Sequence, residues 1–254
     1  MIESKSIVLS DTSPDFTKLL HPPISLDQRG KHEIALIGLD MYNSIPNIDK
    51  KNNTLLYEYS DVKNNLVPDE ALTYENVRKK ITIPIGSYEI SAINDYIQKE
   101  LILHGYPNLF EIGANLNTFK CVIKINNPNV KIDFSENNSI GPLLGFGRNT
   151  LEGESEFESL NIVNILSINS LQVNCSVIEG SYLNEDKKPI IYSFFPNVPP
   201  GYKIVENPQS PIFLPVNIHH IDKIRIWITD QNGRKINIRG EAITIRLHLR
   251  SYFQ

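Results

Sequence analysis

The chain has 254 residues, 41% of them hydrophobic and 21% charged, and is long enough to bury roughly 75% of its unfolded surface in one large domain. Its 25 basic and 29 acidic residues give a net charge of −4 and form no like-charge block, which argues against general binding to nucleic-acid phosphates. No apolar run approaches the roughly 20 residues that cross a bilayer, and no signal peptide is evident, so we expect neither membrane association nor secretion.

The first 30 residues combine the apolar run Ile7–Leu9 with turn residues and the pair Pro22-Pro23. Two consecutive prolines exclude a helix and remove strand hydrogen-bond donors. Residues 1–30 are therefore predicted to form an extended N-terminal arm. The arm either docks on a neighbouring subunit or closes this subunit's own sheet, and residues 31–254 are expected to form one domain.

Strands with one helix are expected from residue 31 to about residue 105. Residues 33–40 are apolar on both parities, as in a strand that is covered on both faces. Two more strands are predicted at 54–59 and 80–84, with a long loop over 60–78. Ser87 is predicted to cap one amphipathic helix that ends near Gly105, because apolar residues recur there at spacings of three and four: Ile90, Ile93, Ile97 and Leu101.

After the helix the hydrophobic period changes to two. Residues 117–134 are predicted to form a hairpin in which Cys121 shares a buried face with Phe119, and Cys175 is likewise predicted to be a small buried residue. Residues 140–146 are interrupted by glycine and proline and are expected to form a loop or an irregular edge strand. The acidic stretch 152–158 is expected to be a solvated loop.

The last third of the chain alternates cleanly between apolar and polar residues, at 171–177, 224–229 and 243–250. The turn Asp230-Gln231-Asn232-Gly233 between the last two runs is a hairpin signal. About eight strands without repeated strand-helix units predict an all-β fold. We expect a single jelly-roll antiparallel β-sandwich with one amphipathic helix and an extended N-terminal arm.

Residue patterns for catalysis are lacking. His219 and His220 are adjacent and would point to opposite faces of a strand, unlike paired metal ligands. The glycine-rich segment 141–148 lacks the Gly-Lys-Ser/Thr ending of a phosphate-binding loop. We therefore expect no enzymatic activity, no cofactor and no metal. The single Trp227 leaves open a non-catalytic jelly roll that binds carbohydrate or another ligand.

The stretch Pro199-Pro200-Gly201-Tyr202 has two interpretations. It matches the short Pro-Pro-x-Tyr motif that WW domains bind in a polyproline-type conformation. It also suits a rigid loop between strands, in which Gly201 permits a turn. A four-residue match does not decide between them.

Several of these segments together resemble a known family. The element Leu143-Leu144-Gly145-Phe146, the stretch from Phe194 to Ile204, the turn at 230–233 and Arg239-Gly240-Glu241 occur in an order similar to that in the penton (minor capsid) proteins of Polinton/Maverick elements and adintovirus-like viruses. The likeness extends over most of the chain from about residue 31.

The resemblance implies a structural virion protein that forms homopentamers at the fivefold vertices of an icosahedral capsid. Its expected partner there is a major capsid protein with two fused jelly rolls. It would be made in the cytoplasm of the host cell, with assembly there or in the nucleus. Candidate contact elements are the arm, the 139–158 loop and an interaction loop with Phe194, Phe195, Pro199, Pro200 and Tyr202.

Overall fold

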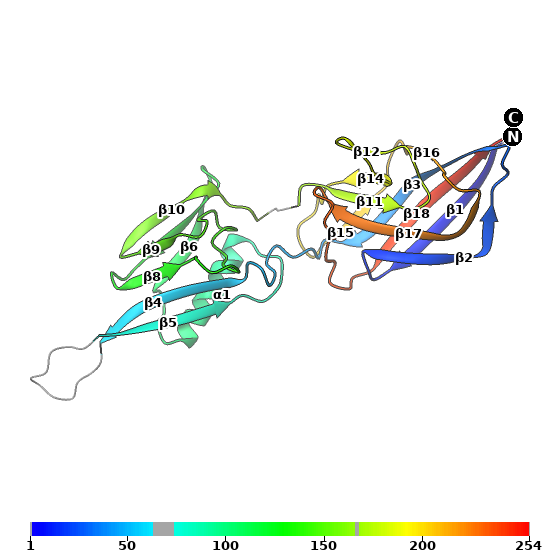
Figure 1. Cartoon of the computed structure of the whole chain (residues 1–254). Helices are drawn as coiled ribbons and strands as arrows, with labels where there is room; N and C mark the ends of the chain where they lie inside the picture. The colour runs from blue at the N-terminus through cyan, green and yellow to red at the C-terminus, as the bar shows by residue number, and fades with distance from the viewer. Residues whose placement is uncertain (1, 63–73, 166–167, 254) are drawn as a thin grey trace, which may run out of the picture. The chain divides into compact units, whose positions relative to one another are not determined.

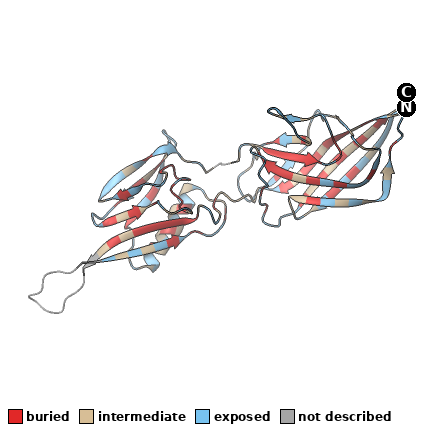
Figure 2. Ribbon diagram, viewed as in Figure 1, coloured by how far each residue is buried: buried red, intermediate tan, exposed pale blue. Residues whose placement is uncertain are grey.

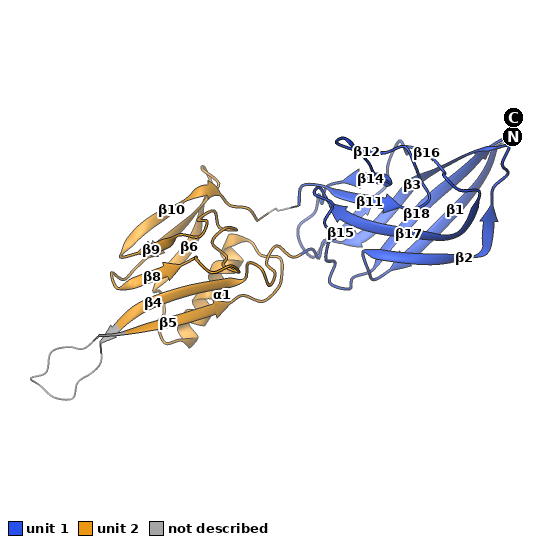
Figure 3. Ribbon diagram, in the orientation of Figure 1, with its two compact units in different colours: residues 1–45, 168–254 blue, residues 46–167 orange. Residues whose placement is uncertain are grey.

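The computed structural model describes residues 2–62, 74–165 and 168–253 (Figure 1). The chain divides into two compact units, unit 1 with residues 1–45 and 168–254 and unit 2 with residues 46–167 (Figure 3). The prediction of one domain over 31–254 is therefore wrong. Each unit has a hydrophobic core of its own, and the chain leaves unit 1 in mid-fold to build unit 2 before it returns.

Unit 1 consists of a five-stranded and a four-stranded antiparallel sheet, whose apolar side chains form a shared core. Buried positions lie along the strands of both sheets (Figure 2). The first sheet has the order β1 (Ile2–Asp11), β18 (Ile243–Tyr252), β3 (Lys31–Tyr42), β15 (Lys203–Glu206), and β16 (Leu214–Pro215) also pairs with β3. The second sheet has the order β14 (Ile190–Phe194), β11 (Leu171–Cys175), β17 (His220–Asp230), β2 (Asp15–Ser25). A small hairpin of β12 (Tyr182–Leu183) and β13 (Asp186–Lys187) precedes β14.

The strand order of unit 1 is that of a jelly roll. If the eight longer strands are counted along the chain, one sheet holds the first, eighth, third and sixth, and the other holds the fifth, fourth, seventh and second. Consecutive strands thus alternate between the sheets at most steps, as two interlocked Greek keys require. The predicted all-β jelly-roll class is confirmed, and unit 2 is inserted between the third and fourth strands.

The N-terminal segment is part of the sandwich and not a free arm. β1 pairs with β18 without a bulge, and β2 pairs with β17. Ile7, Leu9 and Phe16 are buried in the core, because the period of two in this segment turns them to the inner face. The second alternative, a segment that closes its own sheet, is correct.

In its described residues, unit 2 has two further antiparallel sheets and one helix. One sheet has the order β5 (Tyr74–Thr82), β4 (Thr54–Val62), β8 (Val130–Asp133), β9 (Thr150–Glu152). The other has the order β10 (Ser155–Ile162), β7 (Lys120–Ile125), β6 (Phe110–Asn115). Helix α1 (Ile90–Leu103) packs beside β6 and buries Ile93, Ile97 and Leu101.

The ends of the helix test two predictions. Gly105 adopts a φ of +90°, which confirms the left-handed residue that ends the helix. The predicted cap at Ser87 is wrong, because Glu89 occupies the position before the first helical residue and makes no side-chain capping bond.

Three sequence predictions fail, the first of them because the hydrophobic period does not specify a strand's partner. The hairpin at 117–134 is wrong, since β7 and β8 belong to different sheets. The stretch 152–158 lies largely in β9 and β10 instead of a loop. β4 and β5 also extend into the predicted loop at 60–78, of which residues 63–73 lie outside the described residues.

The predicted turn at 230–233 forms, but it does not join the expected strands. The Gly233 N–H donates to the Asp230 carbonyl at 3.0 Å, and Gly233 has a φ of +74°. Thr229 then forms an antiparallel bridge with Lys235. β17 and β18 lie in opposite sheets, so the chain crosses the sandwich after this turn.

Candidate functional site

The predicted interaction loop joins β14, the edge strand of the second jelly-roll sheet, to β15, the edge strand of the first. Phe194, the last residue of β14, is buried and stacks on Tyr192 with ring centroids 6.0 Å apart. Phe195 and Tyr202 are 66% and 65% exposed. Neighbouring residues of a strand point to opposite faces, so the chain separates a core phenylalanine from a surface one. Phe194 therefore belongs to the core and not to a contact surface.

Asn43, directly after β3, fixes the loop in place. Its side-chain amide donates to the Val198 carbonyl at 2.7 Å, and its backbone N–H donates to the Tyr202 carbonyl at 2.9 Å. The Gly201 N–H donates to the Asn43 carbonyl at 2.8 Å, and Val198 packs against the core. These hydrogen bonds fix the loop that carries the exposed Phe195 and Tyr202. A fixed loop loses less conformational entropy when its side chains bind a partner.

The Pro-Pro-Gly-Tyr segment is a tight turn. The Tyr202 N–H donates to the Pro199 carbonyl at 3.2 Å, and Gly201 has a φ of +85°, as the third position of a type II turn requires. WW domains bind the extended polyproline conformation, so they would have to open this turn first. The geometry therefore favours the rigid-loop interpretation.

The glycine-rich segment after residue 139 is a packing element of unit 2. Leu143, Leu144 and Phe146 are buried, and Gly145 has a φ of +85°. A Cβ atom on Gly145 would lie 2.2 Å from the Asn161 carbonyl oxygen, so only glycine permits this approach to β10. Residues 139–146 of the predicted contact loop at 139–158 are thus largely core, whereas 150–152 and 155–158 lie in β9 and β10 and are mostly exposed.

Groupings for metal or nucleophilic chemistry are few. Within residues 2–62, 74–165 and 168–253, no three His, Cys, Asp or Glu side chains are placed to hold a metal ion. Cys121 and Cys175 are buried, and loss of solvent raises their thiol pKa to about 12 and about 11, far from a reactive thiolate. The His220 ring nitrogen Nδ1 lies 3.4 Å from the Ser25 hydroxyl.

An open hollow of about 500 Å³ lies between the β12–β13 turn and the turn at 231–233. Its walls carry mostly polar and charged side chains, among them Glu185, Asp186 and Lys188. Small-molecule sites are usually lined mostly by apolar side chains, whereas here Leu183 supplies the apolar lining.

No helix in the described part of the chain has both the length and the apolar character needed to span a bilayer.

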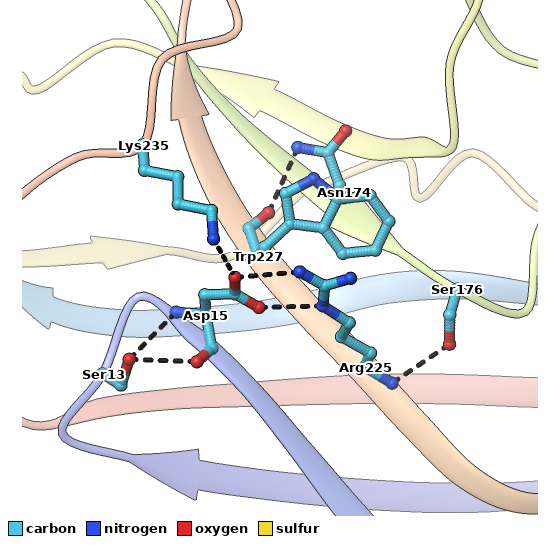
Figure 4. A network of polar contacts seen from close by, with 7 residues as sticks. All are labelled: Ser13, Asp15, Asn174, Ser176, Arg225, Trp227 and Lys235. Atoms are coloured by element: carbon cyan, nitrogen blue, oxygen red, sulfur yellow. Dashed lines mark hydrogen bonds and ion pairs between the residues drawn. The ribbon is translucent and has the colours of Figure 1, made fainter.

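Trp227 lies in a polar network on the outer face of the second sheet (Figure 4). The Arg225 guanidinium lies 5.0 Å from the centre of the Trp227 ring and makes two 2.9 Å bonds to the Asp15 carboxylate. Lys235 adds a third contact to Asp15 at 2.5 Å. A sugar would need a free face of this ring, and Arg225 already contacts the ring. The network joins β2 to β17 and to the segment after the 230–233 turn.

Replacing Asp15 with Asn should lower the free energy of unfolding by about 1 kcal/mol near neutral pH, because Arg225 and Lys235 are half-exposed and solvent screens the pair. Hydrogen bonds from Arg225 and then Lys235 lower the Asp15 pKa from 3.8 to about 2. The stabilisation is therefore present above pH 3.8 and lost as the pH falls through about 2. Urea unfolding of both proteins at about pH 7 and about pH 2 checks this. A difference that does not shrink in acid would contradict it.

Sequence reasoning missed a group of exposed apolar side chains in unit 2, Leu116, Phe119, Leu160 and Ile162. Phe119 was expected on the buried face with Cys121. It lies instead in the β6–β7 turn with a φ of +56°, which turns it out of the alternating pattern. Asn115 and Asn117, residue types that favour turns, are the sequence signal that could have placed Phe119 in a turn.

The chain matches known proteins in structure and not in sequence. No protein-family model matches the chain, and no curated protein sequence matches it. Among solved structures, the crystal structure of the selenomethionine-labelled mavirus penton protein aligns over 99% of this chain and 100% of its own. The TM-score is 0.48 and the sequence identity is 8%.

Proposed function

We propose that the chain is a structural capsid protein, a penton subunit that forms pentamers at the fivefold vertices of an icosahedral shell. The observation that carries the proposal is the jelly-roll strand order of unit 1, in a sequence whose motifs resemble those of penton proteins. Because one fold serves many functions, the strand order by itself supports only the architecture. The order of the motifs adds the capsid role.

Three of the segments that carry the resemblance lie in loops and at the ends of strands of unit 1. Phe194–Ile204 contains the end of β14, the anchored loop and the start of β15. The turn at 230–233 follows β17, and residues 239–241 precede β18. In the last of these, Arg239 and Gly240 both have positive φ, at +56° and +78°. These positions define strand ends and loop shapes, as expected of a protein that acts through its surface.

A ring of five copies needs a head-to-tail contact between two different surfaces of each subunit. The affinity of such contacts comes mainly from a few well-packed aromatic or apolar anchors. Phe195 and Tyr202, exposed on a loop that Asn43 fixes, suit this role, with Pro199 and Pro200 as stiff neighbours. The partners that the proposal implies are sister copies and a double jelly-roll major capsid protein, and the place of action is the virion.

Replacing Phe195 and Tyr202 together with Ala is expected to weaken pentamers about 10- to 100-fold, because both side chains are anchors for a neighbour. The thermal midpoint of the monomer should stay unchanged, since both side chains are already exposed. Native mass measurement over a dilution series gives the dissociation constant.

The matched control is Ile212→Ala, which removes an exposed apolar side chain elsewhere in unit 1 and should leave the pentamers intact. Pentamers of unchanged affinity in the double variant would remove the loop from the interface.

A carbohydrate-binding jelly roll remains the second candidate, on the observation that Trp227 is on the outer face of its sheet. The contact with Arg225 weakens that candidate. Sugar-array binding that is lost on Trp227→Ala would favour it over the capsid role.

A further inference from the structure

Unit 2 exposes four large apolar side chains at one end of its three-stranded sheet. Leu116, Phe119, Leu160 and Ile162 are 81%, 72%, 75% and 64% exposed. The strand register brings their two segments together, since Ile162 pairs with Lys120 and the Val163 N–H donates to the Phe119 carbonyl at 2.9 Å. We call these four residues the turn patch. Exposed apolar side chains gathered on neighbouring segments commonly mark an interaction site.

The turn that carries this patch is firmly held. The Asn115 side-chain oxygen accepts from the N–H groups of Asn117 and Thr118 at 3.1 and 3.4 Å. The Glu158 carboxylate on β10 accepts from the Thr118 hydroxyl at 2.9 Å and from the Asn115 amide at 3.0 Å. The turn and the end of β10 that carry the four side chains are therefore held next to each other.

Phe119 adopts a backbone conformation that disfavours a bulky residue. Its φ of +56° lies in the left-handed region, where Gly or Asn would be free of most of the strain. The side chain is mostly exposed, so burial within unit 2 does not offset this strain. Strained backbone of this kind occurs preferentially at functional positions.

A second apolar surface lies at the other end of unit 2. Ile102 and Leu103, at the end of α1, are both more than half exposed, and we call them the helix patch. The Asn94 side chain bonds to the Ile112 N–H and the Gln98 side chain bonds to the Phe110 carbonyl, so α1 runs antiparallel to β6. The helix patch thus lies beyond the start of β6 and the turn patch beyond its end, about 20 Å apart along the strand.

We propose that the turn patch of one copy binds the helix patch of the next copy, so that unit 2 contributes a head-to-tail contact to the pentamer. This rests on the proposed penton function. A closed ring requires two different surfaces on each copy, and unit 2 carries two apolar ones, which lie beyond the two ends of β6. A twofold contact through the turn patch alone would leave the helix patch uncovered.

Cysteine cross-linking of the full chain tests the pairing. Phe119→Cys protein is mixed with Leu103→Cys protein and treated with a short bis-maleimide. The native Cys121 and Cys175 are buried, so they contribute little background. We expect cross-linked dimers from the mixture and, from the double variant, a ladder that ends at five copies. Ile212→Cys, whose parent side chain is also 72% exposed but lies in unit 1, is the matched control and should not join Leu103→Cys.

The remaining outcomes separate this pairing from the penton function. Pentamers without a Phe119–Leu103 cross-link overturn the pairing and leave the function standing. Efficient cross-links of Phe119→Cys with itself show a twofold contact and also overturn the pairing. Protein that stays monomeric with and without the shell protein contradicts both. A second variant, Phe119→Asn, suits the left-handed backbone, so it should raise the unfolding midpoint and weaken pentamers by at least about tenfold.

Discussion

Deletion of residues 2–25 is expected to prevent folding of unit 1. The deletion removes β1 and β2, an edge strand from each jelly-roll sheet, and takes Ile7, Leu9 and Phe16 out of the core. Each such side chain contributes about 1.5–3 kcal/mol on burial, and a whole domain is stable by only about 5–15 kcal/mol. Near-ultraviolet circular dichroism and hydrogen exchange of unit 1 amides measure the loss.

Two neighbouring residues of β1 give a graded version of this experiment. Leu9→Ala removes a buried side chain and should cost about 2–5 kcal/mol. Val8→Ala removes an exposed one and should change the stability by no more than about 0.5 kcal/mol. A truncated chain that keeps native unit 1 stability would contradict the assignment of this segment to the sandwich. Loss of pentamers on truncation would therefore report unfolding and not a lost docking arm.

Replacing Gly145 with Ala should destabilise unit 2 by about 3 kcal/mol or more. Two effects add, because the residue has a φ of +85° and its new Cβ would lie 2.2 Å from the Asn161 carbonyl oxygen. Backbone and β10 would have to move apart, which would disturb the buried Leu144 and Phe146. Urea unfolding followed by a unit 2 probe measures the change.

Gly153→Ala is the matched control for the backbone effect. Gly153 has a φ of +88°, and a Cβ there would meet no atom within 4 Å. This variant should cost only about 1 kcal/mol, the penalty for placing Ala in the left-handed region. Equal losses for the two variants would show that the close approach of Gly145 to β10 contributes nothing.

Alternation of apolar and polar residues predicted strands wherever one sheet face is buried. It located the strands around Ile226 and Leu247 correctly, because every second side chain there is in the core. It also predicted the all-β class and the apolar face of α1. These features depend on local periods of two and 3.6 residues, which are visible in a short window of sequence.

Strand pairing and the division into units depend on contacts between distant residues. β3 and β11 are consecutive strands of one jelly roll, yet the whole of unit 2 lies between them in the chain. Nothing in the local pattern distinguishes strands of unit 1 from strands of unit 2, so one continuous domain was the simplest expectation. The N-terminal strands were similarly open to two interpretations until β18 and β17 were seen beside them.

The candidate loop was predicted in part. Its exposed Phe195 and Tyr202 followed from their position between strands, but the buried Phe194 and the support from Asn43 did not. Asn43 lies more than 150 residues before the carbonyl that it binds. The turn patch was missed because Phe119 continues the parity of the strand that follows it. Its positive φ breaks that parity, and no alternation pattern encodes such a break.

The mass of the purified full-length protein, measured under native conditions with and without the major shell protein, tests the central claim most directly. The penton account predicts closed assemblies of five chains, seen as fivefold rings by negative-stain microscopy. A monomer under both conditions, or a saturable sugar complex of the monomer that depends on Trp227, would contradict it.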